Sequence, residues 1–187
     1  MMKRLCWIMV FLLLLCGCAA REQDMERVMA LRAKLLASPE VSFDAVVTAD
    51  YGAHTYTFKL RCKTDSTGEL TFEVLEPESI AGITGKASVN GGKLTFDDKA
   101  LSFGPLADGS VAPVSGPWIL MNTLRSGYLT SCAVENGSLR VAIDDSYADD
   151  ALHLDIWMDE KDLPARGDVL WQGRRILSIE IENFVIG

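Results

Sequence analysis

From residue 41 to the end of the chain, apolar and polar residues alternate in short runs that are separated by turn signals. Clear examples are residues 41–48, 56–63 and 175–184. Alternation at a period of two sends successive side chains to opposite faces of a strand, so it is typical of β-strands that are buried on one face. The sequences Asn90-Gly91-Gly92 and Asn136-Gly137 lie between such runs and predict hairpin turns. The pattern therefore predicts an antiparallel sheet with one face on a core and the other in water.

Two segments have a helical pattern instead. In residues 22–37 the apolar positions recur every three or four residues, and Pro39 follows the last of them. Residues 118–125 predict a second, short helix, because Pro117 suits a first helical position and Gly127 a helix end. A long sheet twists and curls, and only these two helices are available to cover its concave face. The expected fold class is mainly β (α+β): a strongly curved antiparallel sheet, or half-barrel, closed by an N-terminal helix and a short mid-chain helix.

The N-terminus has the pattern of a signal peptide. Lys3 and Arg4 precede an apolar run at residues 5–15, which is 11 residues long. A helix that crosses a bilayer needs about 20 apolar residues, so this run is too short for a membrane span and has the length of a signal-peptide core.

The segment Leu15-Cys16-Gly17-Cys18 resembles the lipobox of bacterial lipoproteins, although Cys16 stands where alanine, serine or threonine is more common. The resemblance implies that a peptidase cuts before Cys18 and that this cysteine carries covalent diacylglycerol and an N-acyl chain such as palmitate. Two chains hold a protein in a bilayer where one is marginal. The alternative is an ordinary secretory signal in which the cysteines are incidental. Lipidation would divide the chain into a signal peptide at 1–17, a lipid anchor with a short tether at 18–23 and a single domain at 24–187.

The anchor would place the domain on the extracytoplasmic face of the cell membrane, or on the outer membrane if the source has one. Without Lys3 and Arg4, 16 of the 18 basic residues and all 26 acidic residues remain, which gives the mature chain a net charge of −10. A protein that binds nucleic acid or adsorbs to anionic lipid needs a basic surface. We therefore expect no nucleic-acid partner and a membrane contact through the lipid alone.

The sequence lacks the usual signatures of an enzyme or a metal site. It has no G-x-S-x-G motif, no H-E-x-x-H motif and no Walker loop, and His54 and His153 are its only histidines. The acidic segment 144–150 lacks the spacing of an EF-hand and is better explained as a solvated loop. We therefore expect no catalytic residue, no metal and no cofactor apart from the covalent lipid.

Two further residue types leave alternatives open. Trp118, Trp157 and Trp171 could stack on a sugar, but single tryptophans in a β-rich domain are more often core or rim residues. Cys62 and Cys132 either form one disulfide outside the cytoplasm or stay as two buried thiols, and we favour the thiols.

The order of elements in residues 22–184 resembles that of the LolA/LolB-like lipoprotein-carrier superfamily, which includes related lipoproteins of spore-forming bacteria. Its local parts are Glu76-Pro77-Glu78-Ser79-Ile80-Ala81-Gly82-Ile83 after the third strand and Asp162-Leu163-Pro164-Ala165-Arg166 before the last strands. Members have a curved antiparallel sheet whose apolar cavity holds acyl chains or another hydrophobic ligand, and they have no catalytic residues.

The resemblance implies two classes of function. In the first, the curved sheet binds a hydrophobic ligand, which is an acyl chain, a lipid or a lipidated partner. In the second, the core is filled and the protein is a non-catalytic scaffold or cofactor for a cell-envelope or spore-germination protein. Alternation does not separate the two classes, because a packed core and an acyl cavity need the same apolar residues. The residues expected to line a cavity are Phe43, Tyr56, Phe58, Phe72, Phe96, Trp118, Met121, Ile156 and Ile179.

Overall fold

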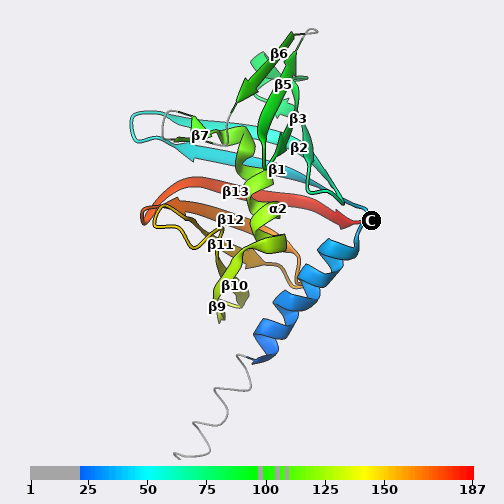
Figure 1. The fold of residues 1–187 in the computed structure, drawn as a ribbon, viewed down its shortest axis with the longest axis vertical. Helices are drawn as coiled ribbons and strands as arrows, with labels where there is room; N and C mark the ends of the chain where they lie inside the picture. Colours follow the sequence, from blue (N-terminus) through cyan, green and yellow to red (C-terminus); the bar gives the residue numbers. More distant parts are fainter. Residues whose placement is uncertain (1–21, 97–98, 104–105, 108–109) are drawn as a thin grey trace, which may run out of the picture.

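The computed structural model describes residues 22–96, 99–103, 106–107 and 110–187. The predicted signal peptide, with Cys18, lies outside the described residues. The fold is mainly β, with one long antiparallel sheet that does not close and with two helices, as the sequence predicts (Figure 1). The strands are β1 (Glu40–Asp50), β2 (Thr55–Asp65), β3 (Leu70–Glu76), β4 (Thr84–Ser88), β5 (Gly91–Phe96), β6 (Lys99–Phe103), β7 (Leu106–Ala107), β8 (Ser110–Val111), β9 (Tyr128–Glu135), β10 (Ser138–Asp144), β11 (Leu152–Met158), β12 (Pro164–Trp171) and β13 (Arg174–Ile186).

Two meanders build the sheet. The 11 strands lie in the order β6-β5-β4-β3-β2-β1-β13-β12-β11-β10-β9, while β7 and β8 pair separately. The first meander is β1 to β6 and the second is β9 to β13, and the antiparallel pair of β1 with β13 joins them. The alternation predicts that every second residue of a strand is buried, and β1 confirms it. Its buried residues are Val41, Phe43, Ala45, Val47 and Ala49.

The mid-chain helix α2 (Gly116–Ser126) covers the concave face of the sheet (Figure 1). It begins with Pro117 in its first turn, where a missing backbone N–H costs nothing. It ends at Gly127, whose N–H donates to the carbonyl of Thr123 at 2.8 Å. Eight of its 11 residues are buried, so α2 is a core element of the fold.

The N-terminal helix, residues 22–37, packs beside the C-terminal end of α2. Its buried side chains are Val28, Leu31 and Leu35, which follow the predicted spacing of three and four residues. The turn between this helix and β1 is stabilised by Ser38, whose hydroxyl donates to the carbonyls of Glu40 at 2.5 Å and Gly187 at 3.0 Å. The end of this helix, the start of β1 and the C-terminus therefore meet at one point (Figure 1).

Element boundaries differ from the prediction in three places. The hairpin loop between β4 and β5 is Val89-Asn90, because Gly91 already pairs with Ser88. Pro113, Gly116 and Pro117 predict a loop at residues 110–117, but this segment contains β8 and a 3-10 turn at Pro113–Ser115 before α2 begins. The sequence predicts a strand at residues 168–171, but β12 already begins at Pro164. Pro164 and Gly167 have no strand signal of their own, and pairing with β11 places them in the strand.

Cys62 and Cys132 are both buried and form no disulfide with each other, as favoured from the sequence. Cys62 lies on β2 and Cys132 on β9, which are six strands apart in the sheet. Burial raises the pKa of the Cys62 thiol far above its ordinary value, so this side chain is a small apolar core residue.

Candidate functional site: a filled concave face and a pocket at its rim

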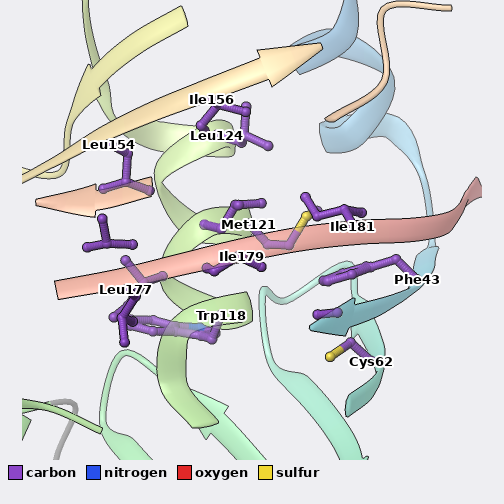
Figure 2. Packing of buried hydrophobic residues seen from close by; sticks show 14 of the residues in the cluster. Phe43, Cys62, Trp118, Met121, Leu124, Leu154, Ile156, Leu177, Ile179 and Ile181 are labelled. Carbon is purple, nitrogen blue, oxygen red and sulfur yellow. The ribbon is translucent and has the colours of Figure 1, made fainter. Parts of the chain in front are cut away.

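Side chains of α2 fill the centre of the concave face. Figure 2 shows Met121 and Leu124 among Ile156, Ile179 and Ile181, which come from β11 and β13. Met121 is 2% exposed, and Ile156 and Ile179 are fully buried. In the described part of the chain, the middle of this face is therefore occupied by packed side chains.

Two glycines let α2 approach the sheet closely. A Cβ atom on Gly167 of β12 would lie 2.4 Å from Cδ1 of Leu120, which is fully buried. A Cβ atom on Gly116 at the start of α2 would lie 3.1 Å from Cδ1 of Leu177 on β13. The contact between α2 and the sheet therefore depends on a missing side chain at two places, the start and the middle of the helix, so the packing of α2 is specific.

The residues expected to line a cavity lie in different environments. Tyr56 is 47% exposed and Phe58 is half-buried, because both lie on the part of β2 that extends beyond the end of its pairing with β3 at Lys59. Phe96 ends β5, and its side chain lies outside the described part of the structure. That this set lines an acyl cavity stays a prediction. The members packed into the core are Phe43, Phe72, Met121, Ile156 and Ile179.

Trp118 is the one member of that set that lines a pocket at the rim of the concave face. The pocket has a volume of about 270 Å³ and lies between α2, the β10–β11 loop and the end of β12. The Trp118 side chain is 9% exposed, and its indole N–H donates to the carbonyl of Gly68 at 3.1 Å, which fixes the ring. The other lining residues are Val111, Ile119, Asn122, Thr123, Asp145, Ser146, Asp150, Ala151, Leu152 and Trp171.

The pocket combines apolar walls with polar groups on one side. Trp118, Trp171 and Leu152 give it large apolar surfaces, and the β10–β11 loop adds the carboxylates of Asp145 and Asp150. Asp145 also orders the loop, because its Oδ1 accepts the Leu152 N–H at 2.9 Å. A hydrophobic group with a polar or cationic end is the kind of ligand that such walls suit.

The sequence gives only partial signals for this pocket. The acidic segment 144–150 and Trp171 stand out, but each has an ordinary structural explanation in isolation. The pocket forms because α2 brings residues 118–123 against segments near residues 145–152 and 171, and no short motif records that contact.

Within the described ranges, no group of three or more His, Cys, Asp or Glu side chains is arranged to hold a metal ion. Among the helices of the same residues, none is both long and apolar enough to cross a membrane.

No family model matches the sequence, and no curated protein matches it. Solved structures do match. The chain is similar to a DUF1329 family protein from Desulfovibrio piger, with 9% identity, a TM-score of 0.49 and coverage of 89% of this chain and 93% of that one. The chain is also similar to a putative outer membrane lipoprotein-sorting protein domain from Vibrio parahaemolyticus, again with 9% identity, a TM-score of 0.49 and coverage of 89% of this chain and 93% of that one. For a LolA superfamily protein from Nitrosomonas europaea the identity is 8% and the TM-score 0.44, with coverage of 90% and 94%. A LolA superfamily protein, of the kind that the order of elements resembles, is thus among the structures to which the chain is similar.

Proposed function

We propose that the protein is a lipid-anchored, non-catalytic binding protein on the extracytoplasmic side of a membrane, and that its rim pocket receives a hydrophobic group. The observation that carries this proposal is the pocket beside Trp118, with about 270 Å³ between α2 and the β10–β11 loop. Ligand pockets usually measure roughly 300–1,000 Å³. This pocket therefore suits one end of an acyl chain or a lipidated partner, and not a whole diacyl lipid.

Deeper entry of a ligand would require α2 to move. Leu120 fits against Gly167, and Met121 against the buried residues of β13, so an acyl chain can reach the centre of the concave face only by displacing these contacts. We accordingly propose that binding starts at Trp118 and Trp171, and that the predicted cavity lining is exposed only when α2 shifts.

Binding of an apolar fluorescent probe tests the proposal. The chain from residue 21 onward is purified without detergent from a membrane-containing host, and its native mass and its titration with N-phenyl-1-naphthylamine are measured. We expect copurified lipid or about one probe per chain. Trp171→Ala should weaken probe binding about tenfold, the loss of one aromatic contact surface. Trp157→Ala, a half-buried tryptophan on the opposite face of the sheet, is the matched control. A lipid-free mass together with no probe binding would contradict the proposal.

A second candidate function is a protein scaffold, and the exposed edge strand β9 favours it. β9 ends the sheet, with Tyr128 40% and Val134 54% exposed. An edge strand offers unpaired backbone groups to which a partner can add a strand. Under this alternative, Val134→Pro should abolish chemical crosslinking to a membrane-associated partner and leave probe binding unchanged.

A further inference from the structure

The outer face of β2–β5, opposite α2, carries a row of basic side chains. Cross-strand pairing places Lys63 beside Thr71, Thr71 beside Lys86, and Lys86 beside Lys93. The neighbours of these lysines along each strand, such as Cys62 beside Lys63 and Ala87 beside Lys86, are buried. Successive side chains point to opposite faces, so the three lysines project to the solvent side. The row crosses four strands of the sheet.

A groove of about 490 Å³ follows this row. Its charged lining residues are Arg61, Lys63, Lys86, Lys93 and one carboxylate, that of Glu73, in a chain whose net charge is −8. A second hollow around the β4–β5 hairpin also contains Lys86 and Lys93, so the groove continues past these two lysines. The hydroxyl groups that line the groove are those of Ser42, Thr71, Thr84 and Thr95.

Lys86 and Lys93 form a like-charge pair. They lie directly opposite each other on β4 and β5, an arrangement that destabilises a sheet. Glu69 accepts from Lys86 at 2.6 Å, whereas no carboxylate in the described part of the chain pairs with Lys93. The pair therefore retains an uncompensated positive charge where the two hollows meet.

The other basic residues of the groove, Arg61 and Lys63, form ion pairs whose carboxylates a bound anion can readily replace. Arg61 lies 3.7 Å from Asp44 and 3.9 Å from Glu73, and Lys63 lies 2.8 Å from Glu40. Arg61 and Lys63 are 63% and 57% exposed at the side chain, and ion pairs with such exposure contribute only about 0–1 kcal/mol. An anion in the groove can replace these carboxylates at small cost.

The spacing and the donors of the groove identify the chemistry of the ligand. Lys86 and Lys93 are close enough to share one phosphate, whereas Lys63 and Lys93 are three strands apart, roughly 14 Å at about 4.8 Å per strand. A longer anion can contact both ends of this row at once. Cations interleaved with hydroxyl donors suit phosphate oxygens, which accept hydrogen bonds from several directions. We propose that this groove binds a polyphosphate chain through at least two consecutive phosphates.

The position of the groove favours a polymer over the headgroups of the bilayer. Arg27, near the start of the N-terminal helix, bonds to Asp162 in the β11–β12 turn, and β5 is six strands from β12. The groove thus lies toward the opposite end of the sheet from the first described residues (Figure 1), to which the predicted lipid anchor at Cys18 is joined. This inference is independent of the pocket beside Trp118.

Titration with inorganic polyphosphate tests the groove. The full chain, in an uncharged detergent, is titrated calorimetrically with polyphosphate at two salt concentrations. We expect binding that weakens with salt, about a tenfold loss in Lys93→Gln and a salt slope lower by about one. Lys93→Arg should retain binding, and Lys161→Gln, an exposed lysine in the β11–β12 turn, should leave it unchanged.

Thermal melting separates this role from a structural one. Because Lys93→Gln removes a like-charge neighbour of Lys86, its Tm should equal or exceed that of the parent while its binding falls. The proposal is overturned if polyphosphate does not bind, or if Lys86→Gln and Lys93→Gln together leave its affinity unchanged. Orthophosphate bound as tightly as the polymer would overturn the chain-length argument. Flotation with phosphatidylglycerol vesicles but not with phosphatidylcholine vesicles, in the absence of polyphosphate binding, would overturn the choice of a polymer.

Discussion

At the scale of single residues, Gly167 decides how closely α2 lies to the sheet. Leu120 occupies the space that a side chain at position 167 would need, since a Cβ there would be 2.4 Å from its Cδ1. Leu120 is fully buried, so it has little freedom to move aside. The glycine is required for this close contact, and its backbone is not in the left-handed region.

We expect Gly167→Ala to lower the free energy of unfolding by about 1–3 kcal/mol, the usual cost of overpacking. Leu120→Val should be destabilising by itself, but less so in the Gly167→Ala background, because the smaller side chain relieves the overlap. Urea denaturation of the two single variants and the double variant measures the coupling. Strictly additive losses would mean that the two residues do not determine each other's packing.

At the scale of the elements, two arginines join the helices reciprocally. Arg32 of the N-terminal helix donates from Nη2 to the carbonyl of Gly127 at 2.7 Å, just past the end of α2. Arg125 of α2 donates from Nη2 to the carbonyl of Leu35 at 3.1 Å, in the last turn of the N-terminal helix. Each cation therefore meets the negative end of the other helix dipole.

Among the described residues, neither arginine forms a salt bridge or a hydrogen bond with a carboxylate, and their Nε atoms are buried without a hydrogen-bond partner. Burial lowers the pKa of both guanidinium groups from its ordinary value, although each stays charged at neutral pH. The contact thus has a desolvation cost, which backbone carbonyls offset for both arginines and the charge of Asp65 offsets further for Arg125.

Arg125→Lys should lower the free energy of unfolding by about 1–2 kcal/mol. Lysine keeps the charge but lacks the planar fork that reaches both Leu35 and Asp65, whose carbonyl accepts from Nη1 at 2.9 Å. The control is Arg61→Lys, a substitution at an exposed side chain, which should change stability by no more than about 0.5 kcal/mol. Equal losses in guanidinium chloride denaturation would rule out the reciprocal contact as a distinct source of stability.

The β2–β3 turn has a pH-dependent element of its own. The hydroxyl of Thr67 donates to Oδ1 of Asp65 at 2.7 Å, and the backbone N–H groups of Thr67 and Glu69 donate to the same oxygen. These bonds, of which the one from the Thr67 hydroxyl has the largest effect, hold the pKa of the Asp65 carboxyl below its usual range. A depressed folded pKa stabilises the protein above the unfolded pKa, and that stabilisation is lost as the pH falls through the folded value.

Asp65→Asn should therefore flatten the acid side of the stability profile. Between pH 7 and about pH 2, the variant should lose less free energy of unfolding than the parent, by under about 1 kcal/mol because Asp65 is exposed and screened. Asp149→Asn, at an exposed carboxyl in the β10–β11 loop for which no such bonds are found, should follow the parent profile. Parallel profiles for Asp65→Asn and the parent would refute the assignment.

At the scale of the whole molecule, the sheet is open, with β6 and β9 as its edges, and two helices cover part of one face. The pocket beside Trp118 and the basic groove lie on opposite faces of this sheet. The molecule can therefore contact a hydrophobic group and a polyanion without competition between the two surfaces.

The predicted membrane contact is the covalent lipid, because residues 15–18 resemble a lipobox whose cysteine, Cys18, would carry diacylglycerol. We expect Cys18→Ser, which removes the predicted site of diacylglycerol attachment, to abolish lipid labelling of the chain. The domain from residue 21 onward, exported behind a cleavable secretory signal, should fractionate as a protein released from membranes. Cys62→Ser is the control for loss of a thiol and should leave lipid labelling intact. A domain that still sediments with membranes would contradict the assignment.

The local pattern of the sequence predicts the strands on which burial alternates. β1 and the N-terminal helix follow their predicted periods closely, because each of their buried positions contacts the same core. Phe58 follows this reasoning only in part, because it packs against the core but is half-buried. Its place in the alternation predicts burial, but β3 ends before it can cover that part of β2, and the length of a neighbouring strand is not a property of the strand itself.

The sequence by itself determined a one-sided antiparallel sheet, a helix at 22–37 and a short helix after Pro117, because these follow from periodicity and from the backbone limits of proline and glycine. Only the tertiary structure decided that α2 fills the centre of the concave face. Met121, Ile156 and Ile179 would be apolar in a packed core and in an acyl cavity alike. The pocket beside Trp118 and the groove along Lys63, Lys86 and Lys93 likewise depend on tertiary structure, since their residues come from separate strands and loops and meet only when the sheet pairs and curls.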